Sequence, residues 1–191
     1  MRHLGRQDQR AGRHRRRRKE RAGWLSLLAG PGSLDDLNVT FLGRRQQHLS
    51  CRVRARIDAH EGCGGLAVRL DERHHYELEV ASGRLEVRAR IGPLSVAVAS
   101  REVPGEPVVL RIEAIAAQPR DPRDGPDELH LGVEETDGTF TVLSVLDGRY
   151  LSTEVAGGFT GRVIGMYAAT GTVHFDWLDY ASLDGDPGDR H

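Results

Sequence analysis

The chain has 191 residues, which is long enough to bury a core in one domain, and 29% of the residues are charged. Its charges are segregated: residues 1–23 hold ten basic and two acidic residues (net +8), and residues 24–191 hold 17 basic and 26 acidic residues (net −9). The acidic body gives no electrostatic basis for nucleic-acid binding, and no apolar run reaches the roughly 20 residues that span a membrane.

Residues 1–23 form a basic segment with five consecutive cations at positions 15–19. The segment has no apolar period and its like charges repel one another, so we predict a disordered tail. Two alternatives stay open: an arm that binds nucleic acid or membrane, and a stretch that is not native coding sequence. Residues 182–191 are predicted to form a disordered polar end.

From residue 24 onward, apolar and polar residues alternate in a series of short runs. In the run 51–57, Cys51, Val53, Ala55 and Ile57 face one way and three arginines face the other, the period of a β-strand. Further strands are predicted at 24–28, 39–43, 66–70, 76–80, 85–91, 94–99, 108–114, 129–133, 139–146, 162–168 and 173–180. No helical segment is expected, because apolar residues nowhere recur at helical spacing over ten residues.

A dozen short antiparallel strands predict an all-β fold. Polar outer faces and one shared apolar inner face favour a two-sheet antiparallel β-sandwich over residues 24–181 rather than a narrow barrel. The Pro-rich and Asp-rich stretch 118–126 is predicted to be an exposed loop.

The stretch 139–180 organises the chain. Its last two strands, 162–168 and 173–180, are predicted to be joined by a turn at 169–171, with Val173, Phe175 and Trp177 sharing one face. Before them, Gly157 and Gly158 permit positive φ and place Phe159 at the tip of a glycine loop. Phe159 either caps the core or is an aromatic presented to a ligand or partner.

The two cysteines indicate a reducing compartment. Cys51 begins one strand and Cys63 lies beyond its far end, so about 20 Å separates them, too far for a disulfide. We expect two free thiols, Cys51 buried and Cys63 in a turn, in a cytoplasmic protein.

Catalytic carboxylates are not assigned from the sequence. Sandwich-fold glucanases often place them as Glu-x-Asp-x-x-Glu, and the nearest match is Glu135-Thr136-Asp137, which has Phe140 where the last Glu belongs. This triplet precedes a turn and is interpreted as a solvated hairpin tip. No nucleophile elbow or phosphate-binding loop occurs, and no cofactor is implied.

Two groups could suggest a metal. Neighbours in a strand point to opposite faces, so His74 and His75 cannot chelate one ion together; we expect one to face solvent and the other to pack beside Tyr76. Asp176 and Asp179 could ligate calcium, but no calcium-loop spacing supports this. No metal site is therefore assigned.

Several blocks resemble a known family. They are Phe41-Leu42-Gly43-Arg44-Arg45-Gln46-Gln47-His48, the hairpin 65–77, the segment 108–113, Phe159-Thr160-Gly161 and Phe175-Asp176-Trp177-Leu178-Asp179-Tyr180. Over about residues 23–181 the chain is similar to the C-terminal concanavalin A-like domain of glycoside hydrolase family 43 β-xylosidases. The resemblance implies a jelly roll packed on a five-bladed catalytic propeller that holds the three catalytic acids, and nothing in this chain matches that propeller.

The resemblance also sets the functional expectations. The chain is expected to be an accessory domain that supports the propeller and its sugar pocket, where xylo- or arabino-oligosaccharides bind, and to be non-catalytic alone. Phe159 occupies the loop that offers an aromatic side chain to that pocket. The family's opening strand should precede Trp24, so a truncated, frame-shifted or mis-started gene is expected. The alternative is an autonomous carbohydrate-binding module; because most strand aromatics fall on the inward register, xylan binding weaker than millimolar is expected.

Overall fold

The computed structural model describes residues 21–103, 105, 107–117, 125–158 and 161–184. Its strands are β1 (Leu25–Leu28), β2 (Thr40–Arg45), β3 (Cys51–Asp58), β4 (Gly62–Asp71), β5 (His74–Ala81), β6 (Arg84–Ile91), β7 (Leu94–Glu102), β8 (Val108–Ala116), β9 (Asp127–Glu134), β10 (Phe140–Asp147) and β11 (Val163–Ser182). A 3-10 turn, η1 (Gly148–Leu151), and a one-turn helix, α1 (Thr153–Ala156), precede β11.

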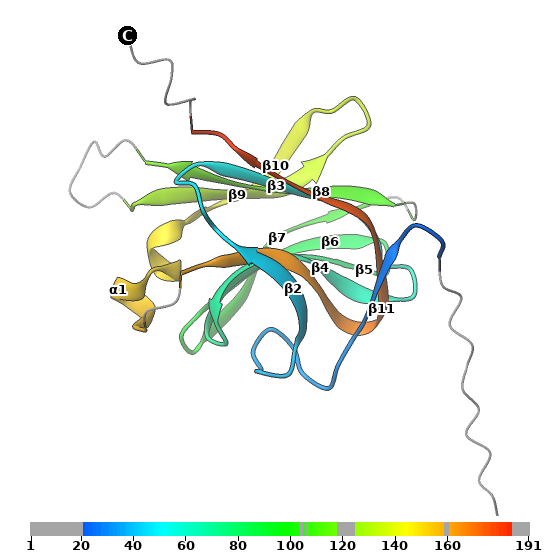
Figure 1. The fold of residues 1–191 in the computed structure, drawn as a ribbon, viewed down its shortest axis with the longest axis horizontal. Helices are drawn as coiled ribbons and strands as arrows, with labels where there is room; N and C mark the ends of the chain where they lie inside the picture. The colour runs from blue at the N-terminus through cyan, green and yellow to red at the C-terminus, as the bar shows by residue number, and fades with distance from the viewer. Residues whose placement is uncertain (1–20, 104, 106, 118–124, 159–160, 185–191) are drawn as a thin grey trace, which may run out of the picture.

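The strands form two stacked sheets (Figure 1), and in both sheets every pair of neighbouring strands is antiparallel. The upper sheet of Figure 1 has the order β10-β9-β8-β3-β11-β1, and the lower sheet has the order β2-β11-β4-β5-β6-β7. The predicted all-β sandwich is therefore confirmed.

The core lies between the sheets and follows the predicted alternation. In β3, Cys51, Val53, Ala55 and Ile57 are buried and the residues between them are half-buried. Fully buried large side chains from both sheets complete the core: Leu66, Tyr76, Leu78, Leu85, Leu110, Ile112, Leu129, Leu131 and Phe175. Burial of one such aliphatic or aromatic side chain stabilises the fold by about 1.5–3 kcal/mol.

The two strands predicted at 162–168 and 173–180 are one strand, so the predicted turn between them is wrong. β11 pairs with β2 and β4 in the lower sheet, bends, and then pairs with β1 and β3 in the upper sheet. The bend lies at Gly171, which has φ +62°, and a Cβ there would lie 2.2 Å from the carbonyl oxygen of Glu61. The same glycine signal thus marks a strand that crosses between sheets, not a chain reversal.

A β-bulge in β11 overturns the predicted orientation of Trp177. Phe175 lies opposite Ile57 and Trp177 lies opposite Arg56, so Asp176 is an extra residue in this strand. One extra residue reverses the alternation beyond it. Leu178 therefore packs on the core, while Trp177 turns to the outer face with 36% of its surface exposed.

Several smaller expectations change. Cys63 is in β4, not in a turn; both cysteines are free thiols, and Cys51 is buried as predicted. The stretch predicted to lack helix contains η1 and α1, each of four residues, too short to produce a helical period. Strand β7 is an edge strand, so its Leu94, Val96 and Val98 are exposed.

The predicted tail and the predicted loop lie mostly outside the described residues. Positions 1–20, 118–124 and 185–191 are not described, and their predictions stay predictions. At the edges of these stretches, Arg21 pairs with Asp58 at 2.6 Å, and the Asp184 carboxylate accepts a hydrogen bond from the Ser50 N–H. Within the described ranges, no helix is long and apolar enough to cross a membrane.

Candidate functional site

The segment between β10 and β11 covers one end of the sandwich. Asp147 ends β10 and caps η1, because its side chain accepts a hydrogen bond of 2.9 Å from the Arg149 N–H. Helix α1 follows, and Gly157 is its C-cap. Gly157 (φ +77°) and Gly158 (φ +81°) are both left-handed, so a glycine is needed at each position, as the sequence indicated. Phe159 and Thr160 lie outside the described residues, so the role assigned to Phe159 stays a prediction.

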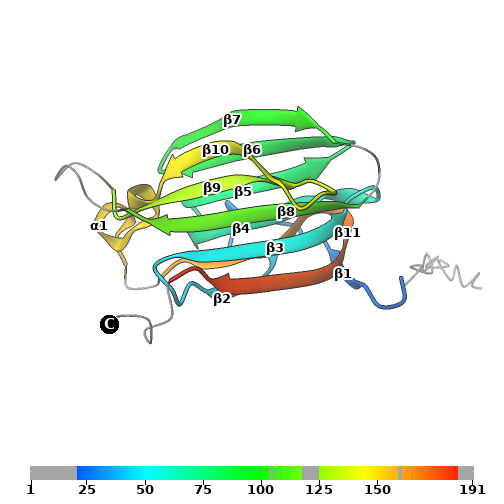
Figure 2. The same cartoon turned by 90° about the horizontal axis from the view of Figure 1, so that it is seen from above.

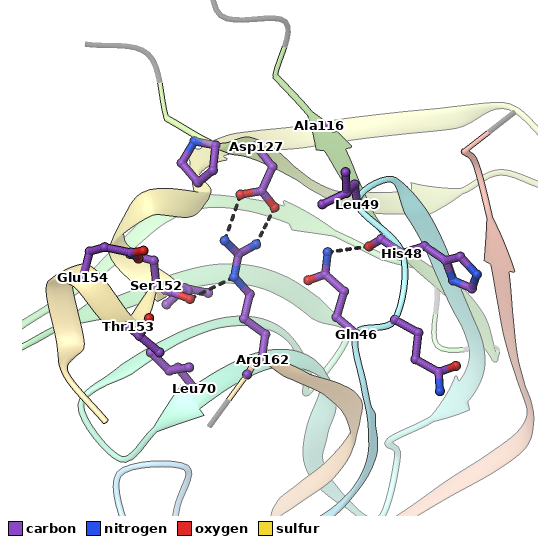
Figure 3. Close-up of a pocket in the computed structure, with 14 residues that line it drawn as sticks. Gln46, His48, Leu49, Leu70, Ala116, Asp127, Ser152, Thr153, Glu154 and Arg162 are labelled. Atoms are coloured by element: carbon purple, nitrogen blue, oxygen red, sulfur yellow. Dashed lines mark hydrogen bonds and ion pairs between the residues drawn. The ribbon is translucent and has the colours of Figure 1, made fainter. Parts of the chain in front are cut away.

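A buried ion pair holds both ends of this segment. Arg162, just before β11, pairs with Asp127 at the start of β9 through both of its terminal nitrogens, one of them at 2.8 Å (Figure 3). The same guanidinium donates to the carbonyl oxygens of Leu151 (2.8 Å) and Gly148 (2.9 Å). Only 12% of the Arg162 side chain and 7% of the Asp127 side chain are exposed. A bidentate pair in this setting fixes the geometry of the segment that leads to Phe159.

A pocket of about 420 Å³ opens beside this pair (Figure 3). One wall consists of α1 residues and Arg162, and the opposite wall is the link between β2 and β3. In that link, Gln46 donates through Nε2 to the His48 carbonyl oxygen at 3.0 Å, and its Oε1 is buried without a hydrogen-bond partner. The Tyr180 hydroxyl accepts a 3.1 Å hydrogen bond from the Gln47 N–H and so fixes the backbone of the link to β11.

The described lining of the pocket holds no two carboxylates that are both free and paired in the way hydrolysis needs. Its two described carboxylates are Asp127, which is committed to Arg162, and Glu154, which is exposed on α1. Glycoside hydrolysis needs an acid and a carboxylate some 5–9.5 Å apart and free to act on substrate. Gln46, which lines the pocket, keeps a buried side-chain oxygen, Oε1, that has no hydrogen-bond partner.

The other residues that the sequence singled out lie away from this end and are engaged elsewhere. Glu135 lies in the β9–β10 hairpin, where Arg101 holds its pKa below the ordinary value. Asp137 accepts a hydrogen bond from the Thr139 N–H at 2.8 Å in the same hairpin. Asp176 pairs with Arg56 at 2.9 Å, and Asp179 pairs with Arg54 at 3.0 Å. Both carboxylates, considered above as calcium ligands, are therefore engaged in ion pairs with arginines.

The two histidines point to opposite faces, as expected for neighbours in a strand, but neither is exposed to solvent as one of them was expected to be. His74 is half-buried and pairs with Asp71 at 2.9 Å, while His75 is buried and lies 3.0 Å from Glu77. Among the described residues, no group of three or more histidine, cysteine or acidic side chains could hold a metal ion.

Sequence reasoning missed one pair of carboxylates. Glu77 and Glu79 are two residues apart in β5 and therefore share its outer face. Each carboxylate lies 3.1 Å from the hydroxyl of the buried Tyr167. Burial raises the pKa of Glu79 above its ordinary value. A Glu-x-Glu alternation was the available signal, but it is also typical of an ordinary solvated strand face, so spacing alone does not identify the pair.

Comparisons with known proteins converge on one kind of domain. A family model described as the β-xylosidase C-terminal concanavalin A-like domain matches residues 8–181. The non-reducing end α-L-arabinofuranosidase BoGH43B of Bacteroides ovatus is 28% identical over 193 residues, which cover 83% of this chain and 33% of that protein. A xylosidase/arabinosidase of Butyrivibrio fibrisolvens is 22% identical over 169 residues, which cover 83% of this chain and 31% of that protein.

Solved structures agree with these matches. The Bacteroides ovatus xyloglucan-locus protein GH43B superposes with a TM-score of 0.72 and 26% identity, over 86% of this chain and 34% of that one. The Bacillus licheniformis family 43 protein BlXynB has the same fold, with a TM-score of 0.70 at 17% identity over 85% of this chain. The chain spans about a third of the length of the curated relatives it matches.

Proposed function

Since the chain belongs to the family of β-xylosidase C-terminal concanavalin A-like domains, we propose that it serves as the accessory β-sandwich of a family 43 glycoside hydrolase. Its partner is a catalytic propeller that supplies the acids, and the substrate is a xylo- or arabino-oligosaccharide. The two free thiols, Cys51 and Cys63, support a reducing, cytoplasmic compartment.

The observation that carries the proposal is the anchored end of the sandwich. Arg162 ties the chain on both sides of the Gly157-Gly158 loop to Asp127, so that loop starts and ends on a rigid base. The pocket beside it has no free pair of carboxylates among its described lining residues, since Asp127 is paired with Arg162. Such an end suits a surface that closes the sugar pocket of another domain: it adds a wall and leaves the acid chemistry to the partner.

The test is a hybrid enzyme. Residues 1–191 replace the C-terminal third of the Bacteroides ovatus arabinofuranosidase, and hydrolysis of an aryl α-L-arabinofuranoside is measured beside urea unfolding. Phe159→Ala is expected to lower kcat/KM about tenfold or more, which is about 1.4 kcal/mol of transition-state stabilisation, because a lost wall admits water and frees the substrate. The unfolding free energy is expected to change by less than about 0.5 kcal/mol.

Val155→Ala is the matched control, since Val155 is exposed on α1 in the same segment. It should leave kcat/KM within about twofold of the unmodified hybrid, an effect below about 0.4 kcal/mol. A Phe159→Ala variant that loses about 3 kcal/mol of stability and keeps normal kinetics would instead identify Phe159 as a core residue.

A further inference from the structure

The outer face of the upper sheet is an ordered surface that the proposed function does not use. In Figure 1 no third layer of strands or helices covers this sheet, and Figure 2 looks down on it. Strand registers place Trp177, Arg56, Val109, Glu134 and Phe140 in one row across β11, β3, β8, β9 and β10. With strands about 4.8 Å apart, the row spans about 19 Å from one aromatic to the other.

Around this row lies a group of charged side chains, most of them ion-paired, named here the arginine–carboxylate grid. It comprises Arg52, Arg54, Arg56, Arg111, Glu113, Glu134, Asp176 and Asp179, four cations and four anions. Arg54 bridges Glu134 and Asp179 at 3.0 Å each, and Arg111 contacts Glu134 at 3.2 Å. The grid therefore has no formal net charge while it offers many fixed donors and acceptors.

Trp177 is the exposed aromatic residue at one end of this row. The β-bulge at Asp176 is what turns the indole outward, since regular alternation would bury it. The Arg54 guanidinium lies 5.6 Å from the ring centroid and Arg56 is opposite Trp177 in the ladder. With 36% of its surface exposed, the indole is accessible to a ligand beside these polar groups.

We propose that this face binds a neutral polysaccharide chain, with a sugar ring stacked on Trp177 and hydroxyls bonded to the arginine–carboxylate grid. Nucleic acid requires a net positive surface, and the cores of protein interfaces are depleted of charged residues. A polar face whose arginine–carboxylate grid has no formal net charge and which carries an exposed indole fits an uncharged, polyhydroxylated ligand better than either. The choice of xylan and arabinan as probes rests on the proposed function.

The experiment is affinity electrophoresis of the full chain in native gels that contain soluble arabinoxylan or linear arabinan. Retardation is expected, with an apparent Kd weaker than about 1 mM per binding segment. Trp177→Ala is expected to weaken binding at least fivefold, and Trp177→Phe, which keeps a ring, to restore most of it. The control is Leu94→Ala, which removes an exposed apolar side chain on β7 of the other sheet and should change affinity less than twofold.

Three results would overturn the proposal: no retardation of the wild-type chain by either neutral polysaccharide, equal retardation of Trp177→Ala, or retardation only by anionic polygalacturonate. This assay uses the chain without a propeller, whereas the hybrid enzyme is assayed on a single small glycoside that cannot span the face. Failure of one proposal therefore leaves the other standing.

Discussion

The buried pair between Asp127 and Arg162 offers the sharpest test of how the pocket end is built. Asp127→Ala leaves a guanidinium that is 88% buried with two carbonyl partners and no counter-charge. Loss of one member of a buried ion pair costs about 3–5 kcal/mol, a large share of the 5–15 kcal/mol that stabilises a typical domain. With an m-value of about 2 kcal/mol per molar urea, the midpoint should fall by about 1.5–2.5 M.

The chain contains its own control in an exposed pair of the same chemistry. Arg56 and Asp176 are 43% and 28% exposed, so Asp176→Ala should cost no more than about 1 kcal/mol. Urea unfolding followed by tryptophan fluorescence measures both variants. The double variant Asp127→Ala/Arg162→Met should lose less than the sum of its single changes, because it leaves no charge stranded. Equal losses for Asp127→Ala and Asp176→Ala would refute the view that burial makes the Arg162 pair important.

Two further predictions concern the buried titratable groups. Burial raises the pKa of Glu79, so the neutral carboxyl group stabilises the fold below the unfolded pKa, and this contribution is lost as pH rises through the folded pKa. Glu79→Gln should therefore gain stability relative to wild type between pH 4.5 and pH 7. A constant difference between the two proteins across that range, measured by urea melts, would contradict this. Burial raises the pKa of the Cys63 thiol to about 12 and that of the Cys51 thiol above its ordinary value. A chromogenic disulfide reagent at pH 8 should therefore label neither thiol in the native chain and both thiols in urea. Rapid labelling of the native protein would contradict this, because it would show that the thiols are accessible.

Much of the fold could be predicted because a half-buried strand has a local signature. The alternation in β3 named the buried residues correctly, since period-2 patterning depends only on which face meets the core. Trp177 was assigned to the wrong face because a bulge at Asp176 changes the phase without any composition signal of its own. The point at Gly171 where β11 crosses from one sheet to the other looks like a turn in the sequence. A strand crossing and a chain reversal can both use a glycine with positive φ.

The candidate site could be predicted only in part. The left-handed Gly157 and Gly158 follow from their chemistry, and the family resemblance drew attention to Phe159. The pairing of Arg162 with Asp127, however, joins residues 35 positions apart, and neither belongs to a motif. Gln46 lies in one of the family-like blocks, but its unpaired oxygen depends on packing that one sequence does not encode locally.

Membership of β11 in both sheets has a consequence for how the domain is synthesised. β11 follows every other strand along the chain, yet it pairs with four of the first ones: β1, β2, β3 and β4. Neither sheet is continuous until β11 has left the ribosome, so the nascent domain must hold its earlier strands as unpaired edges, and long-range closure of this kind is slow. A chain stopped before β11 would expose apolar faces of both sheets at once, which makes it a substrate for chaperones and proteases rather than a smaller stable sandwich.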